Sequence, residues 1–279
     1  MVMAAMVVLA AGVALAEIRV GTDASETLTG TNSADRLTGM AGNDTLKGLA
    51  ANDVYHFDDG FGDDTLTETA FVQAGTERLP GGIDTLTFYQ VSNNINLTIR
   101  LVPQASAQSY NRVYGDNGDS VNLGTSPVEN ATGGAGGDSL TGGSAKNTLS
   151  GGPGGSDDLV DYGGTDGNAA FPALAASSDT YKGFTLGTGD DGIYDFGGTA
   201  DKLDLRPLDS YDVSFFATDR DGNAANGNES LRIVINDTNS VTVTGHFSPI
   251  SQAQENGRME QIIFSNEVVT NAAQLNALM

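Results

Sequence analysis

The chain has 279 residues and a formal charge of −23, from 13 Lys and Arg against 36 Asp and Glu, and 39% of its residues are hydrophobic. This charge argues against nucleic acid or anionic lipid as partners and favours cations, while the apolar content is too high for simple disorder. The absence of Cys excludes disulfides, thiolate catalysis and Cys-ligated metals, and two His give zinc catalysis poor support.

Residues 1–16, "MVMAAMVVLAAGVALA", form an apolar run that ends in Ala-Leu-Ala before Glu17. This pattern predicts a secretory signal peptide. No Lys or Arg precedes the run, which leaves a membrane anchor as the alternative, but about 16 residues is short for a spanning helix. We therefore expect a secreted, extracellular mature protein with no membrane span.

Three residue classes recur every nine positions in the following stretch. The series are Gly30, Gly39 and Gly48; Asp35, Asp44 and Asp53; and Leu28, Leu37, Leu46 and Tyr55. This period predicts a three-residue strand followed by a six-residue turn, with the apolar residue of each strand buried in a stacked ladder. Gly suits the turns because a positive φ costs it little, and Asp supplies the hard oxygen that Ca²⁺ prefers.

The stretch resembles the haemolysin-type (RTX) calcium-binding repeat, GGxGxDxUx. The resemblance implies an all-β fold, a parallel β-roll (a right-handed β-solenoid) in which two units complete one coil. It also implies that each Ca²⁺ lies between turns stacked on the same edge. Asp35 would then pair with Asp53, and Asp44 with Asp64.

The first repeat block, residues 17–69, departs from the consensus in places. Only the turn that begins at Gly39 also has Gly at its fourth position, Gly42. Tyr55 and Leu66 stand eleven apart, which predicts a longer turn between them.

A connecting segment, residues 70–130, separates the two blocks. Alternating apolar residues in "GGIDTLTFYQVSNNINLTIRLV" predict β-strands, with Asp84 before Leu86. Residues 100–126 are polar and Gly-rich, which is typical of either a long loop or an irregular hairpin that projects from the roll.

The second block, residues 131–166, is closer to the consensus. "GGAGGDSLT" from Gly133 is followed by "GGSAKNTLS", with Asn147 in the Asp position, and by "GGPGGSDDLV". The two-unit rule pairs Asp138 with Asp157. We expect Ala at Asp138 to weaken Ca²⁺ binding and Ala at Asn147 to have little effect on it.

Degenerate repeats and a C-terminal β cap are predicted for residues 167–279. Asp179, Asp191 and Asp201 each stand two before an apolar residue. The tail resembles the antiparallel strands that follow such repeats in haemolysin-related proteins. A cap is needed because the last coil would otherwise expose its ladder and its strand edge.

These patterns predict a secreted Ca²⁺-binding repeat protein whose roll folds on Ca²⁺ binding, with a structural or adhesive role. The expected ligand residues are Asp35, Gly39, Gly42, Asp44, Asp53, Asp64, Gly133, Gly136, Asp138, Gly151, Gly154, Asp157, Asp191 and Asp201. Extracellular polysaccharide or a cell-surface protein are candidate partners. The alternatives are a non-catalytic carbohydrate-binding module and a calcium-dependent polysaccharide-modifying enzyme. Neither HExxH nor GxSxG occurs, so we expect no catalytic activity.

Other features have simpler interpretations. "DRDGNAANGNE", residues 219–229, superficially follows an EF-hand loop but lacks its Gly, so a hairpin turn is favoured. His56 and His246 are expected to be structural. The acid pairs at 63–64 and 190–191 would be available for acid–base chemistry if the repeat did not already account for them. Thr29 and Thr38 are expected to point outward in register, which would suit an ice-binding face, but Arg36 and Lys47 interrupt the neighbouring row.

Overall fold

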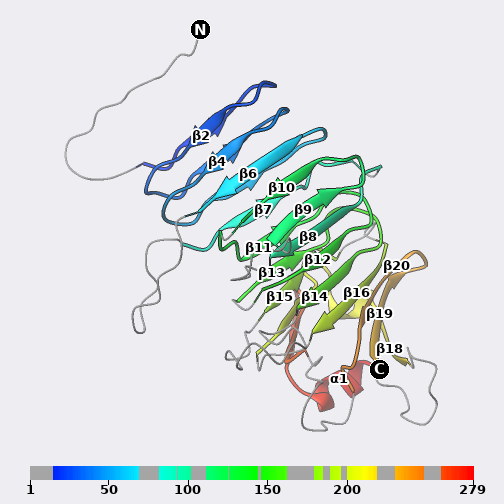
Figure 1. The fold of residues 1–279 in the computed structure, drawn as a ribbon. Coiled ribbons are helices and arrows are strands. Elements are labelled where there is room, and N and C mark those ends of the chain that lie inside the picture. Colours follow the sequence, from blue (N-terminus) through cyan, green and yellow to red (C-terminus); the bar gives the residue numbers. More distant parts are fainter. Residues whose placement is uncertain are drawn as a thin grey trace, which may run out of the picture.

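A computed structural model describes residues 15–68, 82–92, 94–101, 111–124, 126–143, 146–161, 179–184, 189–195, 200–218, 230–247 and 259–279. The predicted signal peptide falls almost wholly outside these residues, as does the EF-hand-like stretch 219–229. Within the described residues, short strands dominate. They form two long sheets that face each other across one apolar core (Figure 1).

The first sheet, sheet A, consists in spatial order of β1 (Ile18–Val20), β3 (Arg36–Thr38), β5 (Val54–His56), β7 (Thr85–Thr87), β11 (Asn130–Thr132), β13 (Thr148–Ser150), β15 (Thr180–Lys182), β17 (Lys202–Asp204), β21 (Gln261–Ile263) and β22 (Val268–Val269). Sheet B consists of β2 (Thr27–Thr29), β4 (Thr45–Lys47), β6 (Asp63–Thr67), β10 (Ser120–Asn122), β9 (Asn111–Gly115), β8 (Leu97–Leu101), β12 (Ser139–Thr141), β14 (Asp158–Asp161), β16 (Asp190–Asp195), β20 (Asn239–Val243), β19 (Ser230–Asn236) and β18 (Ser214–Thr218).

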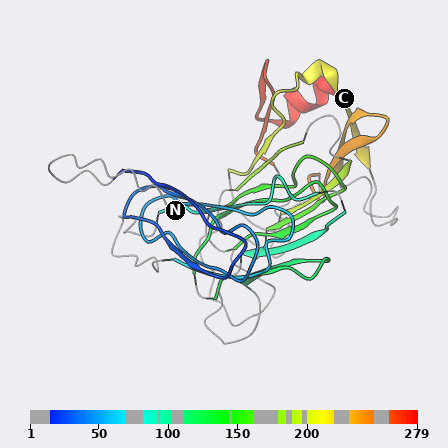
Figure 2. The same cartoon turned by 90° about the horizontal axis from the view of Figure 1, so that it is seen from above.

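The nine-residue period produces this architecture directly. From β2 to β5 each strand has three residues and six residues separate it from the next. Successive strands alternate between the sheets, so two units complete one coil, and coils stack through parallel pairing (Figure 2). The predicted parallel β-roll is confirmed.

The apolar residue of each repeat points inward, as the alternation predicts. The four residues of the first series form two facing ladders rather than one. Leu28 pairs with Leu46 in sheet B, and Leu37 pairs with Tyr55 in sheet A. All four are buried. The sheet A ladder then continues through Leu86, Ala131, Leu149, Tyr181, Leu203 and Ile262.

The longer turn predicted between Tyr55 and Leu66 is wrong. Six residues separate β5 from β6, as in the other repeats, and the two additional residues belong to β6 itself. The strand is longer because Asp63 and Asp64 pair with β10, which has no counterpart in the regular repeat.

Residues 97–101 and 111–122 contribute three strands to sheet B, whereas the part of the expected loop or hairpin at residues 102–110 lies outside the described residues. β9 is antiparallel to both of its neighbours, β8 and β10, whereas β8 pairs in parallel with β12, and β10 with β6. Sheet A runs directly from β7 to β11 at the same level. Sheet B is therefore two strands longer here, by about 10 Å at the usual strand spacing (Figure 1).

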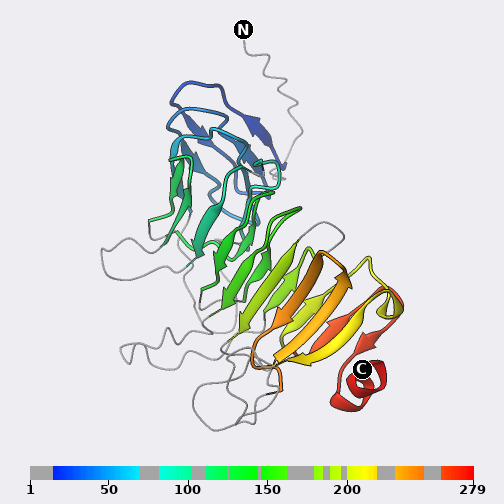
Figure 3. The same cartoon turned by 90° about the vertical axis from the view of Figure 1, so that its right-hand side faces the viewer.

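The C-terminal end carries the predicted antiparallel strands. β20 joins β16 in parallel, and β19 and β18 then add antiparallel edges to sheet B, while β22 closes sheet A. The helix α1 (Ala272–Leu278), whose N-terminal cap is Asn271, was not expected from the sequence. These elements lie at the opposite end of the stack from β1 and β2 (Figure 3). In the described part of the chain, no helix is long and apolar enough to span a membrane.

Candidate metal centre

Acidic side chains line both edges of the roll at the turn that precedes each strand. The carboxylate of each accepts a hydrogen bond from the backbone N–H of the equivalent residue one coil earlier. Asp35 N donates to Asp53 Oδ1 at 2.7 Å, Asp44 N to Asp64 Oδ1 at 2.7 Å, and Asp138 N to Asp157 Oδ1 at 2.8 Å. The three pairings predicted by the two-unit rule are confirmed as neighbours.

The same bond repeats along each edge of the roll, so the acidic residues form two columns; the sheet A column is interrupted at Asn147, and the sheet B column is interrupted between Asp64 and Asp138 by the additional strands of that sheet. The sheet A column comprises Asp35, Asp53, Asp84 and Glu129 and then, beyond Asn147, Asp179, Asp201 and Glu260; the sheet B column comprises Asp44 and Asp64 and then Asp138, Asp157 and Asp191. Asp191 and Asp201 thus occupy the places expected for them. All these acidic side chains except Glu260 are buried.

The glycine that opens each turn lies against the carboxylate of its own repeat. A Cβ on Gly133 would lie 2.3 Å from Asp138 Oδ2 and 2.2 Å from the carbonyl oxygen of Gly151 in the next coil. Gly39 and Gly151 would similarly collide with Asp44 and Asp157. The missing side chain lets a carboxylate oxygen and a carbonyl oxygen from stacked turns face one space, and these are the two ligand types that Ca²⁺ takes from proteins.

The fourth-position glycines make a different contact. A Cβ on Gly42, Gly136 or Gly154 would press on backbone atoms of the neighbouring coil, at 3.0, 2.1 and 2.7 Å respectively. Gly42 also has a φ of +107°, which side chains rarely adopt. These glycines allow the close approach of stacked turns, and a role of their carbonyls in ion binding stays a prediction.

Several of the buried carboxylates have one oxygen without a hydrogen-bond partner among the described residues. These oxygens are Oδ2 of Asp44, Asp53, Asp64 and Asp201. Because an unpaired buried anionic oxygen is costly, the donor set fits a cation. Asp35 and Asp138 differ, since their Oδ2 atoms accept the N–H of Thr31 and Gly134.

Burial raises the pKa of these carboxyl groups. The pKa rises to about 6 for Asp53, about 7 for Asp64, about 6 for Asp138, about 8 for Asp157 and about 7 for Asp201. Loss of water contact is the main cause; the backbone donor from the neighbouring coil lowers the pKa in part, and the charge of nearby acids raises it further. The negative charge of the ionised carboxylates is therefore costly in the folded chain. Either protons or metal ions have to neutralise it.

Asn147 stands in place of a carboxylate at one position of the sheet A column. Its Oδ1 accepts the N–H of Gly143 at 2.8 Å, and its Nδ2 donates to the carbonyl oxygen of Glu129 in the preceding coil. The amide thus supplies the positive end that a carboxylate lacks.

Sequence reasoning missed Glu129 and Glu260 as members of the column, and it did not include Asp84 or Asp179 among the ligands. Glu129 Oε2 accepts the N–H of Asp84 at 2.9 Å, and Glu260 Oε2 accepts that of Asp201 at 2.7 Å. Each Glu stands two before an inward-facing residue of sheet A, Ala131 or Ile262. This two-residue spacing before an inward-facing residue is the sequence signal by which Glu129 and Glu260 could have been found.

The acid pairs do not form catalytic dyads. Asp63 and Asp190 are exposed, whereas the adjacent Asp64 and Asp191 are buried, because successive strand residues face opposite sides. Asp63 instead accepts a hydrogen bond from Ser120, and Asp190 from Ser240, on the neighbouring strands.

The two histidines have structural settings, and the two threonines considered for an ice-binding face do not share a surface. His56 Nε2 lies 3.0 Å from Asp58 Oδ1, and His246 Nδ1 accepts the N–H of Met259 at 3.3 Å. Thr29 and Thr38 lie on different sheets, and Thr38 is buried. The prediction that they face outward in one row, as an ice-binding surface needs, is therefore wrong.

Comparison with known proteins supports the repeat pattern. Residues 20–55 and 128–156 match the family of the RTX calcium-binding nonapeptide repeat (4 copies). These ranges hold the regular turns of the first block and the turns around Asp138 and Asn147. No curated protein matches the chain.

Proposed function

Because the chain carries RTX calcium-binding nonapeptide repeats, which bind Ca²⁺, we propose that it is a secreted protein whose β-roll folds when Ca²⁺ fills the turns. The observation that supports this most is the pair of acidic columns. Each buried carboxylate already bonds to the neighbouring coil through one oxygen, and in four of them the second oxygen has no partner among the described residues.

The columns couple ion binding to folding. Each coil that stacks on the roll buries further carboxylates beside those already there, and the raised pKa values reflect the resulting cost of keeping them ionised. Ca²⁺ that bridges stacked turns offsets this cost only in the folded chain, so its binding energy contributes to folding. The overall charge of −23 acts in the same direction, since it opposes compaction until cations bind.

The calcium concentration outside cells matches this mechanism. Extracellular modules bind Ca²⁺ with Kd values of about 10⁻⁴ to 10⁻³ M, so the sites would fill outside the cell and stay largely empty inside it. RTX repeat proteins are typically secreted, in agreement with a signal peptide at residues 1–16. An extended roll is suited to a structural or adhesive role, with polysaccharide or a cell-surface protein as partner.

The proposal includes a non-catalytic role, which the setting of the acid pairs supports. In the two acid pairs considered for acid–base chemistry, Asp64 and Asp191 are members of the buried columns, whereas Asp63 and Asp190 are exposed and accept hydrogen bonds from serines on the neighbouring strands. The sequence also lacks the HExxH and GxSxG signatures.

The test is a Ca²⁺ titration of the chain followed by far-UV circular dichroism, with Mg²⁺ as control. We expect a cooperative gain of β-sheet signal with Ca²⁺ and little gain with Mg²⁺, which demands octahedral geometry and dehydrates reluctantly. An equally strong β-sheet signal in the presence of a chelator would refute folding on calcium binding.

A further inference from the structure

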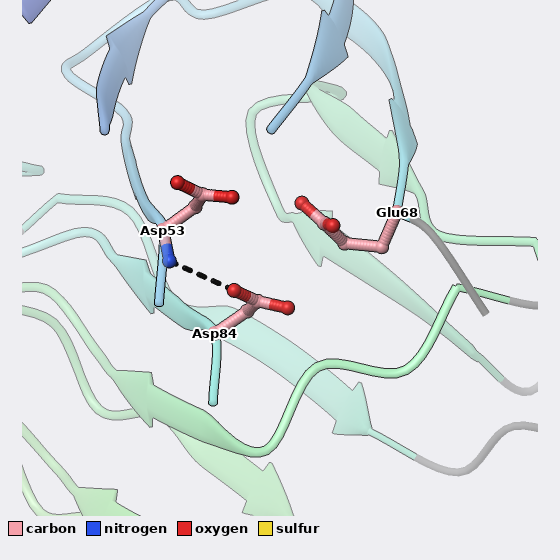
Figure 4. A group of neighbouring side chains, drawn as sticks. All are labelled: Asp53, Glu68 and Asp84. Carbon is pink, nitrogen blue, oxygen red and sulfur yellow. Dashed lines mark hydrogen bonds between the residues drawn. The ribbon is translucent and has the colours of Figure 1, made fainter. Parts of the chain in front are cut away.

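One acidic cluster includes a residue from outside the nine-residue pattern. Glu68 directly follows β6 of sheet B, yet its side chain reaches the sheet A turns that carry Asp53 and Asp84 (Figure 4). Each of the three residues offers a carboxylate oxygen, and these oxygens lie within 4.8 Å of one another. All three side chains are buried. This cluster therefore has three carboxylates where a repeat turn and its stacked neighbour would supply two.

The backbone around the cluster fixes its geometry. Asp53 N donates to Asp84 Oδ1 at 2.8 Å, which holds the two turns together, and Glu68 N donates to Ser126 Oγ at 2.9 Å. Ser126 Oγ in turn donates to the carbonyl oxygen of Leu66. Glu68 is thus anchored by the chain that leaves β10, at the level where sheet B carries its additional strands.

The Tyr55 hydroxyl provides a second, independent observation. Tyr55 is fully buried, and in the described structure its hydroxyl oxygen has no hydrogen-bond partner; nor has Asp53 Oδ2. Both oxygens lie beside the Cα of Gly48. A Cβ on Gly48 would be 2.3 Å from Asp53 Oδ2, 2.3 Å from the Tyr55 hydroxyl oxygen and 2.4 Å from Glu68 Oε1. Three oxygens from three residues therefore surround a space that exists because residue 48 has no side chain.

The chemistry of these oxygens selects the occupant. A water molecule would donate hydrogen bonds but would leave the carboxylates uncompensated in a buried place. The donors are all hard oxygens without nitrogen or sulfur, which suits Ca²⁺ or Mg²⁺ rather than a softer metal. Ca²⁺ accepts six to eight oxygens in flexible geometry, including carboxylates and carbonyls, whereas Mg²⁺ requires a near-ideal octahedron.

We propose that Asp53, Glu68 and Asp84 form a Ca²⁺ site in which Glu68, a residue outside the repeat, joins two turns of the sheet A column, with the Tyr55 hydroxyl beside it. Two ligands come from sheet A turns and one from the end of a sheet B strand, so the ion ties the two sheets together. It does so at the level where β8, β9 and β10 interrupt the regular alternation. The proposal goes beyond folding on the nonapeptide repeats, because Glu68 has no place in the repeat.

The experiment compares the full chain with Glu68→Gln, which removes the charge and keeps the size of the side chain. Asp237→Asn is the matched control, since it removes one negative charge from an exposed position in the turn between β19 and β20. The number of Ca²⁺ ions bound per chain is measured by equilibrium dialysis, and far-UV circular dichroism at saturating Ca²⁺ verifies the fold. We expect Glu68→Gln to bind one Ca²⁺ fewer than the unmodified chain, and Asp237→Asn to bind the same number. Unchanged stoichiometry and affinity in a folded Glu68→Gln variant would overturn the site.

A second measurement decides the matter if Glu68→Gln does not fold. Tb³⁺ replaces Ca²⁺ in oxygen sites, and a tyrosine next to the ion sensitises its luminescence. Tyr55→Phe removes only the hydroxyl, so we expect it to fold and to lose a large share of the tyrosine-sensitised signal. Undiminished luminescence in Tyr55→Phe would then overturn the proposal.

Failure of this site and failure of calcium-dependent folding are distinguishable. A chain whose β-sheet signal is independent of Ca²⁺ would refute the proposed function, and the ion count of Glu68→Gln would still test the site. Conversely, an unchanged ion count with cooperative folding on Ca²⁺ would refute the site alone.

Discussion

Replacement of Asn147 by Ala tests whether hydrogen bonds, instead of an ion, hold stacked turns together at this position of the sheet A column. The amide bonds the N–H of Gly143 and the carbonyl of Glu129. Ala removes both bonds and leaves two buried backbone groups without partners. Each such loss costs about 1–3 kcal/mol, so we expect the free energy of unfolding to fall by roughly 2–6 kcal/mol. The number of bound Ca²⁺ ions should stay the same.

The assay is denaturant unfolding at saturating Ca²⁺, together with equilibrium dialysis. Asp138→Ala is the matched comparison in the same block, because Asp138 carries a carboxylate whose pKa is raised to about 6 by burial. We expect Asp138→Ala to reduce Ca²⁺ binding. The reasoning would be refuted if Asn147→Ala lost as much Ca²⁺ binding as Asp138→Ala, or if its free energy of unfolding changed by less than about 0.5 kcal/mol.

Three further predictions use the same columns and turns. Asn147→Asp keeps the acceptor for Gly143 but removes the donor to Glu129, so its stability should depend more steeply on Ca²⁺ than that of the unmodified chain; equal dependence in a calcium titration of the melting temperature would contradict this. The pKa of Asp64 is raised from 3.8 to about 7, so the folded state binds more protons than the unfolded state. In chelator its contribution to stability is therefore fully present below about pH 4 and is lost as the pH rises through about 7. Circular dichroism in chelator should show more β-sheet at about pH 5 than at about pH 8, and the opposite order would exclude this linkage. Gly189 and Gly60 both have positive φ, but a Cβ on Gly189 would lie 1.7 Å from the carbonyl oxygen of Gly155, while none of the described atoms lies within 4 Å of one on Gly60. Thermal unfolding at saturating Ca²⁺ should therefore show Gly189→Ala to be less stable than Gly60→Ala, and equal losses would mean that the turns can separate.

The fold was predictable where residue spacing alone determines it. Leu28, Leu37, Leu46 and Tyr55 keep one period, so the strand length, the turn length and the inward face all followed from it. Pairing between strands that are distant in sequence was harder. The insertion of β9 and β10 into sheet B depends on contacts such as that between Asp63 and Ser120, which no local pattern reveals.

The candidate site shows the same division. The pairs Asp35–Asp53, Asp44–Asp64 and Asp138–Asp157 followed from the two-unit rule, because the period places equivalent residues above one another. Glu68 could not be found in this way, since only the path of the chain after β6 brings it to the turns of the opposite sheet. The helix α1 was also missed, although Asn271 before an Ala-rich stretch is a helix-start signal.

The most direct test of the account is the radius of gyration of the chain, measured by small-angle X-ray scattering in chelator and in millimolar Ca²⁺. A compact chain of this length has a radius of gyration of about 19 Å, somewhat more for an elongated roll, whereas an unfolded chain has about 59 Å. Folding on calcium binding predicts a value near the upper figure in chelator and near the lower one with Ca²⁺. A compact chain at neutral pH in chelator would contradict it.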